Sequence, residues 1–273
     1  MDRDISNAGR DSVTTITQHA AGMFCWSQLG TKDPEGAKKF YAQLFGWTFD
    51  DAMIDGQGFT LVKKAGKTIG GLYGLMKDQR DRGVEPNWEG YIAVEDADQI
   101  VAQVKKNGGQ ILMGPIDIAD HGRMAVCQDP TTATFSLWQA KRQIGAELVN
   151  EIDTMCWNEL ITDDAAKAGA FYRKLFGWTE EKMPLPERAY TVFKNNGAQA
   201  AGMMQATPEM RLTHPYWLTY FAVADCDKGV AKAQQLGGRT MLKPTDIPNI
   251  GRFSVLTDPQ GAYFAIITME KRA

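Results

Sequence analysis

The sequence has no excess of positive charge and no long hydrophobic run. Its 30 Lys and Arg residues are outnumbered by 33 Asp and Glu residues, so the formal net charge is -3. Without a basic field, no nucleic-acid partner and no membrane surface is expected. No apolar stretch approaches the roughly 20 residues that span a bilayer, and the polar first residues lack the hydrophobic segment of a signal peptide. We therefore expect a cytoplasmic protein.

Histidine is scarce, and cysteine is never paired. The 273 residues include three histidines and four cysteines, and no two cysteines form a CxxC motif. A divalent ion in a catalytic site needs three or four N, O or S ligands, so we expect no metal and no other cofactor. The cysteines are predicted to be buried, reduced thiols: Cys25, Cys127, Cys156 and Cys226.

What the chain does have is an internal repeat. The segment FCWSQLGTKDPEGAKKFYAQLFGWT, from residue 24, recurs as MCWNELITDDAAKAGAFYRKLFGWT from residue 155. Further along, PNWEGYIAVEDAD matches PYWLTYFAVADCD, and GPIDIADHGR matches KPTDIPNIGR. A repeat of more than a hundred residues indicates a tandem duplication. We predict an N-terminal tail over 1–20, a domain over 21–140, a linker over 141–151 and a second domain over 152–270.

Each copy has the pattern of two βαβββ units. In the first unit, Asp33 and Pro34 are a typical start for a helix, and Gly46 is a typical stop. The intervening residues follow an apolar helical stripe, which repeats in the second copy up to Gly177. A strand precedes each helix and about three short strands follow it, and the second unit repeats this order. The predicted fold class is α+β.

The motifs resemble those of the vicinal oxygen chelate superfamily, which includes glyoxalases, bleomycin-resistance proteins and extradiol dioxygenases. They are a strand ending in T-x-D, a helix ending in FYxxLFGW, a strand and helix closing on Gly-Gly, and a DP turn before the last strand. The resemblance implies that each domain folds into a half-open cup of mixed sheet with helices outside. It also implies a cup that holds a metal, a small molecule or both.

Metal-dependent members of that superfamily place ligands on three strands of the cup. The resemblance carries those positions onto Trp26, Glu89 and Ser136 in the first copy, and onto Trp157, Leu218 and Ala265 in the second. An indole cannot ligate a metal, and only Glu89 among the six offers a usual ligand. The metal-binding residues are therefore predicted to be missing from both cups.

Strand alternation predicts what faces each cup instead. If Trp26 faces the cup, so does Gln28, and the same rule applies to the other strands. The predicted ligand-binding residues are Trp26, Gln28, Tyr91, Ser136, Trp138, Trp157 and Tyr220. Glu159 and Glu89 are carboxylates among these aromatic residues, and are candidate acid or base groups. Trp and Tyr on strands are also common as plain core residues, so packing alone could account for them.

Three functions are compatible with this pattern. The first is a metal-free protein that binds a small aromatic or amphipathic molecule, of the sequestration or resistance type. The second is an enzyme of the lyase, isomerase, dioxygenase or hydroxylase type, either metal-independent with a Glu acid or base, or metal-dependent with ligands at other positions. The third is a structural protein whose sheets meet another subunit. The duplication supplies an internal pseudo-dimer, so a monomer or a homodimer is expected.

Overall fold

The structure is a computed structural model that describes residues 15–54, 56–185, 188–210 and 212–270. The elements of the first half are β1 (Phe24–Thr31), α1 (Pro34–Phe45), β2 (Thr48–Ile54), β3 (Gln57–Lys64), β4 (Lys67–Gly74), α2 (Lys77–Asp81), β5 (Asn87–Ala93), α3 (Ala97–Lys106), β6 (Gln110–Ile118), β7 (Gly122–Gln128) and β8 (Thr134–Ala140). Those of the second half are β9 (Met155–Thr162), α4 (Ala165–Phe176), β10 (Thr179–Leu185), β11 (Arg188–Asn195), β12 (Ala198–Gln205), η1 (Pro208–Met210), β13 (Tyr216–Ala222), α5 (Cys226–Gln235), β14 (Arg239–Ile247), β15 (Gly251–Thr257) and β16 (Tyr263–Met269).

The first helix of each half begins and ends as its sequence predicts. Asp33 accepts a hydrogen bond from the backbone N–H of Gly36 at 3.0 Å, which satisfies one of the unpaired donors at the start of α1. Gly46 ends the helix in the left-handed conformation, with φ 69°, which glycine adopts without strain. In the second half, Asp164 and Gly177 cap α4 in the same way. The predicted helices are confirmed.

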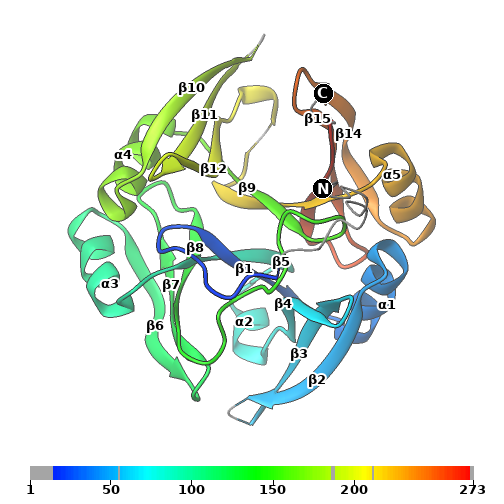
Figure 1. Cartoon of the computed structure of the whole chain (residues 1–273), viewed down its shortest axis with the longest axis horizontal. Helices are drawn as coiled ribbons and strands as arrows, with labels where there is room; N and C mark the ends of the chain where they lie inside the picture. Colours follow the sequence, from blue (N-terminus) through cyan, green and yellow to red (C-terminus); the bar gives the residue numbers. More distant parts are fainter. Residues whose placement is uncertain (1–14, 55, 186–187, 211, 271–273) are drawn as a thin grey trace, which may run out of the picture.

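Each half contributes one eight-stranded mixed sheet. The strand orders are β2-β3-β4-β1-β5-β8-β7-β6 and β10-β11-β12-β9-β13-β16-β15-β14. At the centre of the first sheet, β1 runs parallel to β4 and antiparallel to β5, and β5 runs parallel to β8. The main helices lie around the outside of the molecule (Figure 1). The fold is therefore the predicted tandem duplication of an α+β cup.

The two halves share one hydrophobic core on the helix side of their sheets. That core is continuous from Phe24 in the first half to Phe264 near the C-terminus. Helix α1 packs against α5 of the second half, and α3 packs against α4 (Figure 1). Aromatic rings join the halves, as in the pair Phe45 and Phe221, whose centroids are 5.5 Å apart. The cup side of each sheet carries a separate, smaller apolar cluster.

Two chains of hydrogen bonds cross between the halves, one at α1 and one at α4. Trp88 donates to the Tyr41 hydroxyl at 2.9 Å, and that hydroxyl donates to Asp258 of the other half at 3.2 Å. The second half repeats the chain from Trp217 through Tyr172 to Asp129, with both distances 2.9 Å. All these side chains are buried, so each hydroxyl satisfies groups that would otherwise be unpaired.

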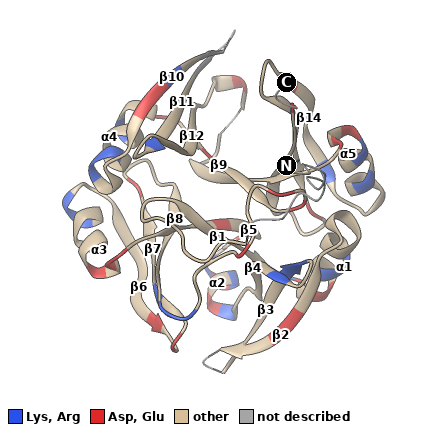
Figure 2. Ribbon diagram, in the orientation of Figure 1, with Lys and Arg blue, Asp and Glu red and all other residues tan. Residues whose placement is uncertain are grey.

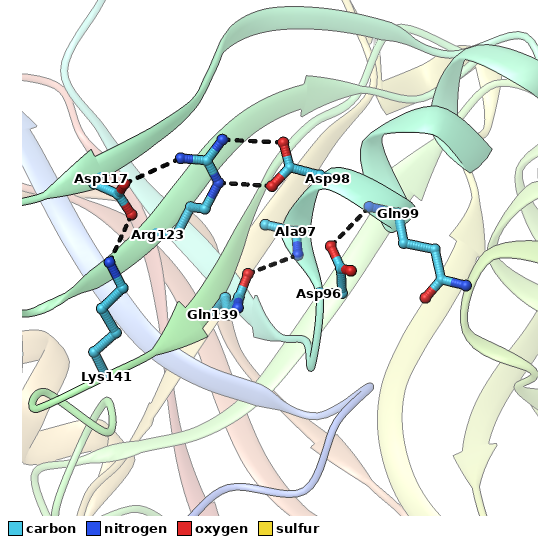
Figure 3. Close-up of polar contacts among 8 residues, drawn as sticks. All are labelled: Asp96, Ala97, Asp98, Gln99, Asp117, Arg123, Gln139 and Lys141. Atoms are coloured by element: carbon cyan, nitrogen blue, oxygen red, sulfur yellow. Dashed lines mark hydrogen bonds and ion pairs between the residues drawn. The ribbon is translucent and has the colours of Figure 1, made fainter.

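Charged residues lie mostly on the helices and outer strands (Figure 2). Arg123 on β7 binds Asp98 of α3 at 2.7 Å and Asp117 of β6 at 3.3 Å, and Lys141 also binds Asp117 (Figure 3). Arg252 repeats this bridge in the second half with Asp227 and Asp246. Such exposed pairs contribute little to stability, and they link β6 and β14 to the neighbouring strands. In the described part of the chain, no helix is long and apolar enough to cross a membrane.

We predict that Tyr41→Phe and Tyr172→Phe each destabilise the protein by about 1–3 kcal/mol. The reason is that each change leaves a buried carboxylate oxygen and a buried indole N–H without their partner. The measurement is urea denaturation followed by circular dichroism. Tyr263, which is 43% exposed, supplies the matched control, and Tyr263→Phe is expected to change stability by less than about 0.5 kcal/mol. Equal effects of all three changes would contradict this role.

Candidate functional site

A hollow of about 2740 Å³ is lined by the concave faces of both sheets. This is larger than the roughly 300–1,000 Å³ of a single small-molecule site, because it takes in both cups. Among the described residues, every large apolar side chain that is exposed, with the exception of Ile152, lines this hollow. They include Met53, which is 70% exposed, and Met241, which is 51% exposed. Exposed apolar surface concentrated in one place is typical of binding surfaces.

The floor of the first cup comes from β1, β5 and β8. Trp26 pairs across the sheet with Tyr91, and Gln28 pairs with Glu89, so all four side chains face the hollow. The indole N–H of Trp26 donates to the Gln28 side-chain oxygen at 3.4 Å. Trp138 also lines the hollow, with its N–H held by the Gln143 carbonyl at 2.8 Å.

Glu89 is the acidic group of the first cup. Ser136 is fully buried behind it and donates its hydroxyl hydrogen to the carboxylate at 2.6 Å. Burial raises the pKa of Glu89, and the Ser136 hydrogen bond opposes that shift. Tyr73 and Tyr91 lie close enough that, besides burial, the charge of Glu89 raises the pKa of both phenols. Ser136 therefore contacts Glu89 and is not among the residues that line the hollow.

In the second cup, the acidic group lies on β9, which pairs with β13, the strand equivalent to β5. Glu159, on β9, is 7% exposed and accepts a hydrogen bond from the Tyr220 hydroxyl at 3.1 Å. The indole of Trp157 donates to the Tyr190 hydroxyl at 2.9 Å. Burial first, and then the charge of Glu159, raise the pKa of Tyr220 and Tyr190 well above the usual phenol range. These tyrosines are therefore neutral hydrogen-bonding groups at ordinary pH.

The two cups differ in which residues surround the carboxylate. Glu89 of the first cup corresponds to Leu218 of the second, and Leu218 pairs across the sheet with Glu159. Ser136 corresponds to Ala265, which takes the same place beside Tyr220. At these paired floor positions there is thus one carboxylate in each cup, on β5 in the first and on β9 in the second.

A glycine in each cup lets two aromatic side chains close over the sheet. Gly71 pairs with Gln28, and Gly202 pairs with Glu159. A Cβ at Gly202 would lie 1.9 Å from the Tyr190 hydroxyl and 2.8 Å from the Trp157 indole nitrogen. A Cβ at Gly71 would likewise lie 2.4 Å from the Phe59 ring. The glycines therefore make room for the aromatic walls.

The donor set of the cups does not fit a divalent metal. Of the six positions that correspond to family ligands, only Glu89 carries a carboxylate, and its partner Ser136 is buried behind it. Within the described ranges, no three His, Cys, Asp or Glu side chains are grouped so that they could hold a metal ion. Cys156 lines the hollow, but burial raises the pKa of its thiol to about 12, so it is not a thiolate nucleophile.

Several lining residues escape a prediction based on the sequence alone. Tyr73 and Phe59 wall the first cup, and Tyr190, Tyr216 and Phe253 wall the second. Tyr73 was detectable, because Gly71 pairs with Gln28 and alternation then turns residue 73 toward the cup as well. Phe59 and Tyr73 lie on β3 and β4, whereas the family's metal-ligand positions correspond to residues on β1, β5 and β8.

Two aromatic-floored cups of βαβββ units, joined in one chain, define a tandem glyoxalase-like protein. The sequence pattern of the Glyoxalase/Bleomycin resistance protein/Dioxygenase superfamily matches residues 18–137 and 149–266, and the chain belongs to this superfamily. It is 42% identical over 254 residues to a protein of Mycobacterium bovis named "Putative glyoxylase CFP32", covering 92% of this chain and 96% of that one. It is 33% identical over 272 residues to the anthracycline biosynthesis protein DauV of a Streptomyces species, covering 94% and 96%.

Solved structures with the same fold are much more distant in sequence. The Mn(II)-bound glyoxalase of Novosphingobium aromaticivorans superposes with a TM-score of 0.62 at 12% identity, over 92% of this chain and 83% of that one. The 2,2',3-trihydroxybiphenyl 1,2-dioxygenase of Sphingomonas wittichii superposes with a TM-score of 0.63 at 12% identity, over 91% of both chains. At this identity the likeness establishes the fold alone.

We predict that Gly202→Ala destabilises the protein by about 1–3 kcal/mol, because the new methyl group must displace Tyr190 or Trp157 from a packed wall. Gly58→Ala is the matched control on strand β3, where a Cβ meets no atom within 4 Å. Thermal unfolding of the two variants tests this. A Gly202→Ala protein as stable as the Gly58→Ala protein would show that the wall is loosely packed.

Proposed function

We propose that the protein binds a flat aromatic or amphipathic small molecule in its cups without a metal ion. The observation that carries the proposal is the gathering of exposed apolar side chains around a hollow whose two floors combine aromatic rings with one carboxylate each. An apolar concave surface with a few placed polar groups is typical of a small-molecule site. The proposed ligand-binding residues are those predicted from the sequence, with Ser136 acting through Glu89.

The rim of the hollow supports a ligand with a large apolar surface. Among its described lining residues are Met53, Met113, Met210, Met241 and Met269. Methionine side chains are flexible and polarisable, so they can adapt to ligands of different shape. The name of the DauV relative refers to anthracyclines, which are polycyclic aromatic compounds of the kind that such a cup would accommodate.

The domain limits 21–140 and 152–270, a cytoplasmic location and a monomer or homodimer remain parts of this proposal.

We predict that a polycyclic aromatic probe binds equally well to protein treated with EDTA and to protein supplied with Mn²⁺, Fe²⁺, Ni²⁺ or Zn²⁺. The expected dissociation constants agree within about twofold, because aromatic and carboxylate groups of the chain supply the binding energy. Isothermal titration calorimetry gives the affinity, and elemental mass spectrometry of the desalted protein gives the metal content. A metal content near one or two ions per chain, with tighter probe binding, would contradict the proposal and favour a metal-dependent function.

The second candidate function is metal-independent acid or base catalysis. The observation that favours it is Glu159, which is 7% exposed in an apolar cup and accepts a hydrogen bond from Tyr220. A carboxylate at such a place can accept a proton from a bound substrate while the neutral tyrosine holds its orientation. Glu89 could act in the same way in the first cup, because burial raises its pKa and so makes the carboxylate a stronger base.

If Glu159 is the base, Glu159→Gln lowers kcat by about a hundredfold or more and leaves substrate affinity near its original value. The amide keeps the size and the acceptor oxygen of the carboxylate but cannot take up a proton. The measurement is kcat and KM for any substrate found by screening. A variant with unchanged kcat would remove Glu159 from the mechanism, and a variant with raised KM and unchanged kcat would assign it to binding.

A further inference from the structure

We infer that the first cup selects ligands that carry a protonated amine, with the Glu89 carboxylate as the counter-ion and the surrounding aromatic rings as a cage. This inference rests on the proposed function and specifies the ligand class of one of the two cups. A carboxylate combined with the faces of Trp and Tyr rings is the arrangement that attracts an organic ammonium ion, because both the charge and the ring quadrupoles act in the same direction.

Glu89 lies at the centre of the cup and lacks a cationic partner from the chain. It accepts a hydrogen bond from the neutral hydroxyl of Ser136, at 2.6 Å. Over the residues that the structure describes, no Lys or Arg forms an ion pair with it. Asp117, which also lines the hollow, is different, because it binds Arg123 and Lys141. A carboxylate that is partly buried without a cation is costly, and a ligand ammonium would offset that cost.

Aromatic side chains from four strands line the hollow together with this carboxylate. Trp26 on β1 pairs with Tyr91 on β5, and Trp138 on β8 lies with its ring centroid 6.5 Å from that of Tyr91. Tyr73 on β4 is near enough to Glu89 for the carboxylate to raise its pKa. The N–H of Trp138 is already bonded to the Gln143 carbonyl, so the ring itself is what Trp138 offers to a ligand.

The second cup is not expected to share this selectivity. Its position equivalent to Glu89 is Leu218, and the position equivalent to Trp138 is Ile267. Its carboxylate, Glu159, is 7% exposed and already accepts a hydrogen bond from the Tyr220 hydroxyl. The carboxylate of the first cup is therefore the better placed of the two to meet a ligand amine.

The selectivity is expected to depend on pH with a defined sign. The other titratable groups around Glu89 are Tyr73, Tyr91 and Cys127, whose pKa values are all raised, that of Cys127 to about 12, so they stay neutral. Burial raises the pKa of Glu89 itself, and the hydrogen bond from Ser136 opposes that shift. Amine affinity should therefore rise as the pH increases through that raised pKa. His121 lines the same hollow, so the assignment of this rise to Glu89 requires a variant.

The test compares two probes of equal size and ring system, 1-naphthylmethylamine and 1-naphthalenemethanol, by isothermal titration calorimetry on the full chain. The amine is expected to bind about tenfold more tightly than the alcohol at pH 7.5. Glu89→Gln should remove that difference and abolish its pH dependence. Glu89→Asp, which keeps the charge on a shorter side chain, should retain part of the preference. Glu95→Gln removes an exposed carboxylate outside the hollow and serves as the matched control.

Each outcome bears on one of the two proposals. Equal binding of amine and alcohol, or an amine preference that survives Glu89→Gln in a protein with unchanged circular dichroism, would overturn the amine inference and leave the proposed function standing. Loss of the preference in Glu95→Gln would show a non-specific charge effect and would also overturn it. Binding of neither probe would contradict both the inference and the proposed function.

Discussion

Two buried hydrogen bonds join the halves, from Tyr41 to Asp258 and from Tyr172 to Asp129, and the position of the cup floors depends on them. One oxygen of Asp258 accepts the backbone N–H groups of Gln260 and Ala262, both at 2.9 Å, and so shapes the turn that starts β16. Its other oxygen accepts the Tyr41 hydroxyl from the opposite half. A single buried carboxylate therefore joins a helix of one half to a floor strand of the other. Because Asp129 does the same before β8, which carries Trp138, the floors of both cups are anchored from across the molecule.

This arrangement separates what supports the fold from what can vary. Tyr41 and Tyr172, and the aspartates that they bind, are the same in the two halves, and all lie in the shared core. The cup floors differ, because Glu89 and Trp138 of the first correspond to Leu218 and Ile267 of the second. Opposite faces of a strand can change independently, since alternate side chains face the core and the cup. The duplication has thus kept one scaffold and produced two different concave surfaces.

The repeat made most of the fold predictable, because each element appears twice with the same caps and apolar stripe. Strand alternation also predicted that four floor residues face the cups, and all four line the hollow: Trp26, Gln28, Trp157 and Glu159. The bond from Tyr41 to Asp258 could not be predicted, since it joins residues 217 positions apart and depends on how the halves dock. The short helix α2 was also missed, because its five residues bury no apolar face that would produce a periodic signal.

The placement of one carboxylate per cup has a physical reason. Gln28 faces Glu89 across the first pair of floor strands, and Leu218 faces Glu159 across the second. Two facing carboxylates in an apolar cup would repel each other and would need a cation between them, as in a metal site. A single carboxylate avoids that repulsion and accepts a hydrogen bond from a neutral hydroxyl group, that of Ser136 in one cup and that of Tyr220 in the other. Because each of these carboxylates faces an uncharged side chain across the sheet, neither floor requires a cation between two acids.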